Sequence, residues 1–455
     1  MEANENKMGT MPIKKLLINM SLPIMISMLV QALYNVVDSI FVAQISENAL
    51  TAVSLAFPVQ NLMIAIAVGT GVGTNALLSR ALGEKDFKKV NDLASNAVLL
   101  GVFSYVVFSI LGLLFSKAYF RFQTNDAQII EYGVAYLSII CIGSIGKFLQ
   151  IVFERLLQST GKTIYTMITQ STGAIINIIL DPILIFGLFG MPRMGTAGAA
   201  IATVIGQIVA AILAIIFNLK VNKEIEINMK GFKPNLEIIK SIYAIGIPSI
   251  IMMSITSVTT YGLNNILKKF SSTAIAVLGV YFKLQSFIFM PVFGLTNGMV
   301  PIIAYNYGAR EKERLIETIK LSMLYGLGIM TFGIVMIQLF PEKILALFNA
   351  SKNMLSIGVP ALRIISLGYL FAGFSIVASS VYQALGNGVL SLTNAISRQL
   401  VVLLPAAYLL SLLGNVNRIW WSFPIAEIMS LVLSIIFLRY IYNQKILPIE
   451  DSNLY

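Results

Sequence analysis

The sequence contains no histidine and only one cysteine, Cys141, in 455 residues. A single cysteine excludes an intramolecular disulfide, and the two absences together exclude a metal centre built from cysteine and histidine ligands. Any proton transfer must therefore use aspartate or glutamate. The sequence also pairs no nucleophile with a base, so we expect that the protein is not an enzyme and needs no cofactor.

Charged residues are also scarce. They make up 12% of the chain, whereas hydrophobic residues make up 57%, and the mean hydropathy is +0.82. A soluble protein of this length needs more polar surface than such a composition offers. Apolar runs near or above the roughly 20 residues that span a bilayer recur from end to end. The sequence therefore predicts an all-α polytopic membrane protein.

The basic residues give the chain a net charge of +11. They lie in short connecting loops and accompany no nucleic-acid-binding motif, so we expect no nucleic-acid partner. When the N-terminus is placed in the cytoplasm, the cytoplasmic loops hold most of the loop lysines and arginines. We therefore expect both termini in the cytoplasm. We also expect that the first span is not cleaved as a signal peptide.

Twelve membrane spans are predicted. Their approximate bounds are 16–43, 50–78, 91–115, 129–158, 165–189, 196–219, 239–267, 274–303, 316–340, 354–384, 390–413 and 418–441. The longest and most charged connection, residues 220–240, divides these spans into six and six. We therefore predict an N-terminal lobe (1–219), a cytoplasmic inter-lobe loop (220–240) and a C-terminal lobe (241–455).

The two halves repeat each other at a constant offset. A shift of 225 residues aligns Pro23 with Pro248, Ala49 with Ala274, Gly69 with Gly294, Gly73 with Gly298, Gly83 with Gly308, Gly101 with Gly326, Gly133 with Gly358, Gln158 with Gln383, and Gly161 with Gly386. Nine matches without a gap, the rarer Pro and Gln included, exceed chance. An even number of spans gives both halves the same topology, which predicts two parallel six-helix lobes related by a pseudo-two-fold axis along the membrane normal. This is the architecture of a carrier that rocks between inward-open and outward-open states.

The first span carries a carboxylate within its apolar sequence. Asp38 shares one helical face with Gln31, Tyr34 and Asn35, and Pro23 lies fifteen residues before it. An ionisable group in a membrane helix costs several kcal/mol unless it faces a cavity or a partner. We therefore predict that this face lines an internal cavity. The alternative is an aspartate near a loop, at the end of a short helix.

A second polar cluster lies in the fifth span. Asn177 and Asp181 are four residues apart and share a face, and Pro182 frees the carbonyl of Ile178 because proline has no N–H. A carboxylate, an amide and a free carbonyl suit a proton or Na⁺. The alternative is a proline kink capped by the aspartate. At the equivalent positions of the second half stand Leu263 and Ala406, which predicts a coupling site in one lobe only.

Other charges lie within predicted spans. Lys283, with Gln285 nearby, either lines the cavity, pairs with an acid of the first lobe or extends to the outer membrane surface. In the fourth span, Lys147 and Glu154 are seven residues apart on one face, and we expect them to pair. Glu154 and its neighbour Arg155 lie near the cytoplasmic end, which favours a structural role. Arg398 and Glu427, in the last two spans, are candidates for a bridge between helices.

These motifs resemble the multidrug and toxic compound extrusion (MATE) family of secondary transporters, in its bacterial NorM- and MepA-like branch. The matching residues are Pro23 with Asp38, the Asn177–Asp181–Pro182 motif, and the segment 198–203. The six-plus-six layout extends the resemblance over essentially the whole chain. The resemblance implies a multi-pass protein of the bacterial inner membrane that exchanges cationic, amphipathic drugs for Na⁺ or H⁺.

The resemblance also implies site residues. Asp38, Asn177, Asp181 and Thr203 correspond to the family's cation site, and Thr196 competes with Thr203 because the preceding loop varies in length. If the ion is Na⁺, Asp38 and Asp181 would bind it. Pro23 and Pro182 are the predicted helix hinges, and Gln31, Tyr34, Asn35, Lys283 and Gln285 are predicted to line the substrate cavity.

The expected partners are small cationic or amphipathic molecules and the lipid bilayer, and we expect a monomer. A flippase for a lipid-linked oligosaccharide or polysaccharide precursor is the alternative function. An anionic lipid headgroup would favour a cleft lined by arginine and lysine. The two acids favour cationic cargo. Some Na⁺-coupled relatives carry acids in the seventh and tenth spans, whereas this chain carries none there, which leaves a second-lobe cation site in doubt.

Overall fold

A computed structural model describes residues 6–227, 232–348 and 350–449. Part of the predicted inter-lobe loop, residues 228–231, lies outside the described residues. All regular structure in the described ranges is helical. Ten of these helices are long and apolar enough to cross a membrane, and two bent helix pairs bring the number of spans to as many as twelve. The all-helical, polytopic architecture predicted from composition is therefore confirmed.

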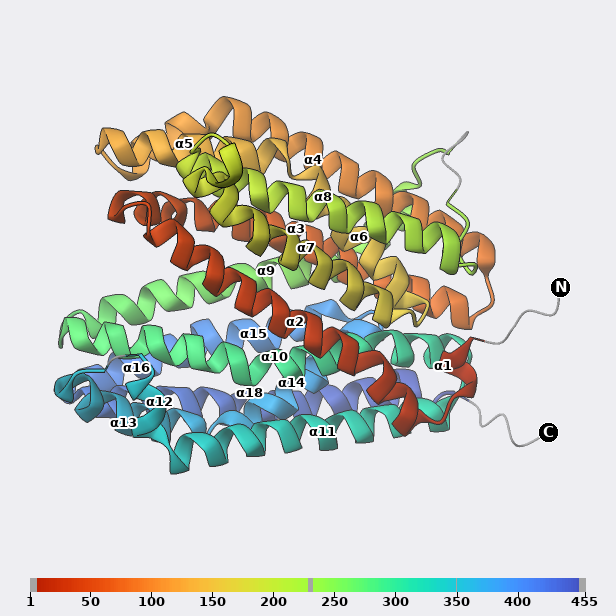
Figure 1. Ribbon diagram of the computed structural model, residues 1–455. Helices are drawn as coiled ribbons and strands as arrows, with labels where there is room; N and C mark the ends of the chain where they lie inside the picture. The colour runs from red at the N-terminus through yellow and green to blue at the C-terminus, as the bar shows by residue number, and fades with distance from the viewer. Residues whose placement is uncertain (1–5, 228–231, 349, 450–455) are drawn as a thin grey trace.

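The first half of the chain forms the upper group of helices in Figure 1, apart from the N-terminal end of α2 and the short α1. Its elements are α1 (Lys7–Thr10), α2 (Ile13–Ala43), α3 (Glu47–Gly83), α4 (Phe87–Gln123), α5 (Ala127–Ile142), α6 (Ile145–Ser159), α7 (Thr163–Phe186), η1 (Leu188–Gly190) and α8 (Gly195–Val221).

The second half forms the lower group (Figure 1). Its elements are α9 (Leu236–Leu267), α10 (Ser272–Gly308), α11 (Lys312–Leu339), α12 (Pro341–Ala346), α13 (Lys352–Ser366), α14 (Tyr369–Ala384), α15 (Gly388–Ile396), η2 (Ser397–Leu403), α16 (Leu404–Ser411), α17 (Val416–Ile419), α18 (Ser422–Ile441) and η3 (Tyr442–Ile446).

The helix bounds repeat at the offset found in the sequence. Helix α3 begins and ends 225 residues before α10, and α7 spans the residues equivalent to α15, η2 and α16 together. The turns repeat as well: Lys85 and Arg310 both adopt left-handed backbone, with φ of 57° and 60°. Corresponding segments therefore form corresponding helices in the same order.

Two spans that were predicted as continuous, 129–158 and 354–384, are broken in the structure. Helices α5 and α6 meet at 43°, and α13 and α14 meet at 49°. The breaks lie at Gly143 and Gly368, which are again 225 residues apart. At the first break the missing side chain matters, because a Cβ on Gly143 would overlap the side chain of Val204 on α8.

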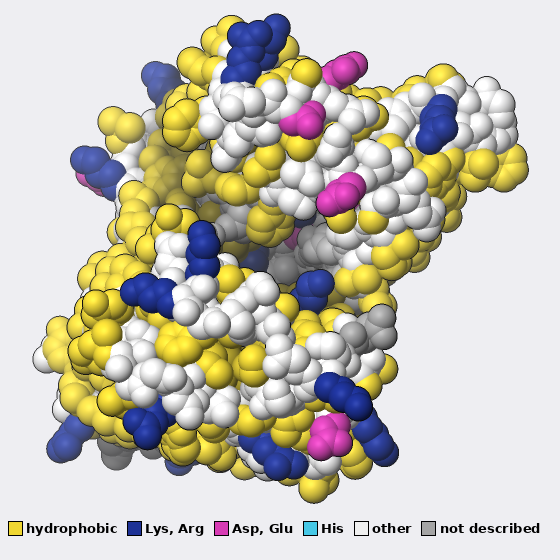
Figure 2. All heavy atoms as spheres, turned by 90° about the vertical axis from the view of Figure 1, so that its left-hand side faces the viewer, with side chains coloured by type: hydrophobic (Ala, Val, Ile, Leu, Met, Phe, Trp, Pro, Cys, Tyr) yellow, Lys and Arg dark blue, Asp and Glu magenta, His cyan; other side chains and the backbone are white. Residues whose placement is uncertain are grey.

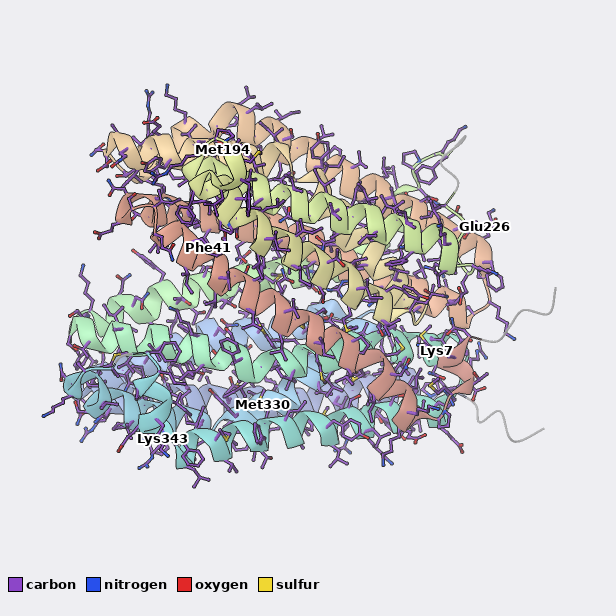
Figure 3. All side chains as sticks on the ribbon, viewed as in Figure 1. Lys7, Phe41, Met194, Glu226, Met330 and Lys343 are labelled. Atoms are coloured by element: carbon purple, nitrogen blue, oxygen red, sulfur yellow. The ribbon has the colours of Figure 1, made fainter. Side chains whose placement is uncertain are left out.

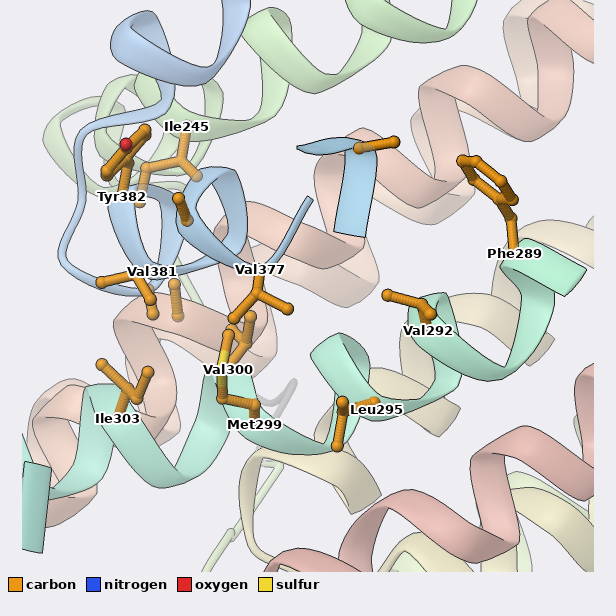
Figure 4. Close-up of a cluster of buried hydrophobic side chains, with 14 of the residues drawn as sticks. Ile245, Phe289, Val292, Leu295, Met299, Val300, Ile303, Val377, Val381 and Tyr382 are labelled. Atoms are coloured by element: carbon orange, nitrogen blue, oxygen red, sulfur yellow. The ribbon is translucent and has the colours of Figure 1, made fainter. Parts of the chain in front are cut away.

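The two groups of helices share a core at one end and separate at the other. One buried cluster includes first-half residues such as Leu16 and Leu156 together with second-half residues such as Ile245 and Val292. Figure 4 shows its second-half part, where α9, α10 and α14 meet. A second cluster, which includes Val42 and Phe148, draws only on the first half. Figure 2, viewed from the end opposite α1, shows the hollow between the two groups.

Glycines allow the close helix crossings at the shared end. Gly69 of α3 and Gly246 of α9 are so close that a Cβ on either would lie 2.7–2.8 Å from the other's carbonyl oxygen, and a Cβ on Gly73 would overlap the carbonyl of Ile242. The equivalent glycines of α10, Gly294 and Gly298, pack against α2 in the same way. Small residues permit such contact between membrane helices, so the seam between the halves follows the repeat.

We predict that Gly73→Ala lowers the melting temperature of the purified protein in detergent by several degrees. Alanine is favoured over glycine within a helix by about 1 kcal/mol, so a loss of stability would come from the forced separation of α3 and α9. The matched control is Gly328→Ala on α11, where nothing lies within 4 Å of the added methyl group. An unchanged melting temperature for Gly73→Ala would contradict the close crossing.

Candidate functional site

Two carboxyl groups meet inside the first half. Helix α2 supplies Asp38 and α7 supplies Asp181, and their side chains lie within hydrogen-bond reach of each other. Asp181 is fully buried, and each group has one oxygen, Oδ1, that is buried without a hydrogen-bond partner among the described residues. Two like charges this close in a low-dielectric interior repel strongly. A shared proton or a bound cation removes that repulsion.

Asn177 and Thr203 support the acid pair. Oriented to satisfy its neighbours, the Asn177 amide donates to Oδ2 of Asp181 at 3.0 Å, and its oxygen accepts from the backbone N–H of Thr203 at 2.9 Å and the Thr203 hydroxyl at 3.1 Å. The amide orientation follows from this network. Thr196 bonds elsewhere, to the carbonyl of Tyr132 at 3.3 Å, so Thr203 is the threonine that joins the cluster.

Two tyrosines also reach the acids. Tyr34 lies near Thr203, and the side chains of Tyr34 and Tyr136 both lie close enough to interact electrostatically with Asp38 and Asp181. Gln60 donates to the Tyr136 hydroxyl at 3.0 Å. Hydroxyl, amide and carboxylate oxygens can coordinate a hard cation, and the carboxylates can also bind a proton. Tyr136 and Gln60 were not predicted from the sequence, although both are polar residues within predicted spans.

The cluster faces a cavity of about 490 Å³ in the first half. The predicted cavity residues Gln31, Tyr34 and Asn35 line it together with Asp38 and Asn177. The interpretation of the first span as a helix with a cavity-lining polar face agrees with this placement.

Two other predicted cavity residues lie elsewhere. Gln285 lines a second cavity, of about 520 Å³, which lies mostly in the other half and is bordered by Val68, Val72, Asn75 and Arg155 of the first. Lys283 is exposed and lines neither of these two cavities. Of the five predicted cavity residues, three therefore line the first cavity, one lines the second and one lines neither.

The second cavity has the equivalent position but different chemistry. Leu263, the counterpart of Asp38, lines it and is buried. The predicted bridge between Arg398 and Glu427 is present in its wall at 2.8 Å. Arg398 lies on η2, a stretch of wider π-type helix that precedes Pro405. The acid pair of the first half thus has no counterpart at the repeat-related position.

The fourth predicted span contributes another buried carboxylate. Glu154 accepts hydrogen bonds from Gln150 at 3.0 Å, Thr169 at 2.8 Å and Gln170 at 2.8 Å. The expected direct pair with Lys147 is absent, because no ion pair within 4.0 Å joins them among the described residues. Glu154 acts on Lys147 only at longer range.

The adjacent Arg155 points to the other half. Its Nη1 donates to Asn297 of α10 at 2.7 Å and to Gln158 at 2.9 Å. Arg155 therefore joins the two halves, as its predicted structural role requires.

Both hinge prolines lie within continuous helices. Helix α2 runs through Pro23 and α7 through Pro182. The carbonyl of Asn19, which Pro23 leaves without a helical partner, accepts from the Thr163 hydroxyl at 3.4 Å. Bending at either proline stays a prediction.

The chain is similar to known membrane transporters along most of its length. The family model MatE matches residues 23–183 and, a second time, residues 248–409. The multidrug export protein MepA of Staphylococcus haemolyticus (strain JCSC1435) is 28% identical over 441 residues, which cover 97% of this chain and 96% of that protein. The two family matches start 225 residues apart, as the internal repeat does.

Two solved structures share the fold. One is an outward-facing conformation of a multidrug resistance MATE family transporter of the MOP superfamily; it aligns with a TM-score of 0.90 at 25% identity and covers 96% of this chain and 98% of that chain. The other is a MOP superfamily transporter from Pyrococcus furiosus Vc1, for which reverse polarity of the binding pocket suggests a different function. It aligns with a TM-score of 0.90 at 25% identity and covers 99% of this chain and all of that chain.

We predict that Thr203→Val weakens the binding of the ion at the acid pair, so that any activity controlled by the pair requires a higher ion concentration. Valine has nearly the shape of threonine but cannot hydrogen-bond to Asn177. A hydrogen bond in a charged network contributes about 1.5 kcal/mol or more, so the ion concentration for half-effect should rise by about tenfold. Thr203→Ser keeps the hydroxyl and should behave like the wild type. Equal effects of Thr203→Val and Thr203→Ser would exclude a role for the hydroxyl.

Proposed function

Because the chain belongs to the MATE family, we propose that it is a secondary active antiporter that exports cationic amphipathic compounds in exchange for Na⁺ or H⁺. The observation that carries this proposal is the contact between Asp38, which lines a cavity of the first half, and Asp181, which is buried beside it. Carboxylates within a membrane span are costly, and such residues generally mark ion pathways or proton relays.

Orientation follows from the loops. Both ends of the chain are assigned to the cytoplasm by the excess of basic loops on that side. Lys7 and Glu226 then lie on the cytoplasmic side and Lys343 on the outer side, at opposite ends of the molecule in Figure 3. The hollow between the halves faces outward in this orientation, and the described conformation corresponds to the state that exchanges ion for cargo at the outer surface.

Ion binding supplies the driving force. In the outward-open state a cation or proton enters the first-half cavity and neutralises the acid pair. Moving one charge through a potential of 100 mV contributes about 2.3 kcal/mol, which biases the conformational equilibrium roughly fifty-fold. The bend of α2 at Pro23 would change with occupancy, since the helix lacks one hydrogen bond there. Return of the ion to the cytoplasm resets the carrier.

A transport assay in proteoliposomes tests the function and the ion together. A Na⁺ gradient and a pH gradient are imposed separately, and movement of a cationic dye such as ethidium is followed by fluorescence. We expect one of the two gradients to drive the dye against its concentration. Dye movement that neither gradient accelerates would overturn the proposal.

We predict that Asp38→Asn and Asp181→Asn each abolish gradient-driven dye transport and leave dye binding measurable. Asparagine has the shape of aspartate but cannot carry the charge that the ion neutralises. Glu131→Gln is the matched control, because Glu131 is an exposed carboxylate of the same half on α5. Abundance in the membrane is checked by immunoblotting.

The Asp38→Asn result decides the coupling assignment. A variant at wild-type abundance that transports dye at the wild-type rate, with the same ion dependence, would contradict the role of the acid pair. Loss of transport in Glu131→Gln would show that the assay responds to any lost carboxylate.

A further inference from the structure

The first-half cavity also contains a basic group that the ion-coupling mechanism does not use. Lys147 of α6 is half-buried and lines the cavity with Gln150 and Gln170. Its ammonium makes no hydrogen bond and no ion pair with the described residues. The carboxylate that acts on it, Glu154, is already held by three other donors. Lys147 therefore presents an uncommitted positive charge to the cavity.

An uncommitted ammonium at this position is costly. A lysine at the centre of a membrane helix costs about 2.5–3.5 kcal/mol on insertion scales, and cavity water offsets only part of that cost. Such a residue generally marks a pathway or a ligand site. The missing partner is an anionic group or a strong acceptor, and that partner would enter with the cavity's occupant.

The charges of the cavity are separated along its length. Glu154 on α6 touches Gln170 on α7, and the two consecutive helices run in opposite directions. A position seven residues before Glu154 is therefore level with one about seven residues after Gln170, near Asn177. Lys147 then lies about one helical turn, or about 6 Å along the axis, from the level of Asp181. A molecule of drug size can reach both ends at once.

We propose that Lys147 binds an anionic group of the transported molecule, so that the cavity accepts zwitterionic amphipaths, with an amine toward the acid pair and a carboxylate toward Lys147. The inference rests on the proposed function, because it assumes that cargo enters the cavity of the acid pair. Glu154 is a positioning residue for Lys147. Its three hydrogen bonds fix its carboxylate, which attracts the Lys147 ammonium at longer range and leaves it free for a ligand.

The test compares two dyes that differ in one group. Rhodamine B is a zwitterion with a free carboxylate, and its ethyl ester is a permanent cation of nearly the same shape. Binding of each dye to the purified protein is measured by fluorescence polarisation without any gradient. For Lys147→Gln we expect the dissociation constant of rhodamine B to rise by about tenfold, as for a lost charge-assisted hydrogen bond, and that of the ester to stay within about twofold.

Two further variants complete the comparison. Lys147→Arg keeps the charge and should retain most of the affinity for rhodamine B. Lys117→Gln, which removes an exposed lysine of α4 in the same half, should change neither dissociation constant. Equal effects of Lys147→Gln on both dyes, or no effect on either, would overturn the proposal and assign Lys147 a structural role toward Glu154.

A measurement on the wild-type protein needs no variant to fold. Benzoate, a small aromatic carboxylate, should compete with rhodamine B for Lys147 and weaken its binding, and it should leave binding of the ester unchanged. Competition against both dyes alike, or against neither, would also overturn the proposal. Failure of the antiport proposal is separately visible, because gradients would then move neither dye in proteoliposomes while the binding difference could still be present.

Discussion

The cost of charge in an apolar interior governs this molecule. Asp38 lines a cavity and the buried Asp181 lies next to it, while Asn177 hydrogen-bonds to both Asp181 and Thr203. These polar surroundings make the two acids tolerable. Neither side chain could face lipid without a loss of several kcal/mol. The polar face of α2, the polar face of α7 and the cavity beside them are consequences of the same constraint.

The internal repeat explains the geometry but not the chemistry. Helix bounds, turns and glycine crossings recur at 225 residues, so both halves have a cavity in an equivalent place. The side chains that line the cavities have diverged: Leu263 stands where the first half has Asp38, and the ion pair of Arg398 and Glu427 supplies charge from different helices. One fold thus provides two cavities whose linings differ in charge.

Much of this could be predicted from sequence, since hydropathy and spacing are local properties. The spans, the repeat and the shared face of Asn177 and Asp181 all follow from residue order. The breaks at Gly143 and Gly368 were missed because hydropathy does not distinguish a bent span from a straight one. The separation of Lys147 from Glu154 was missed for another reason: helical spacing brings them to one face, but Thr169 and Gln170 come from another helix and occupy the carboxylate.

Helix α2 links the candidate site to the seam between the halves. Its C-terminal part carries Asp38 into the first-half cavity, and its N-terminal part packs against α10 at Gly294 and Gly298. Pro23 lies within the packed part, between Ser21, which lies against Gly298, and Met25, which lies against Gly294. The helix lacks a hydrogen bond there and is easiest to bend. A change of charge at Asp38 therefore acts on the same helix that packs the two halves together, and that helix is easiest to bend where it packs against α10.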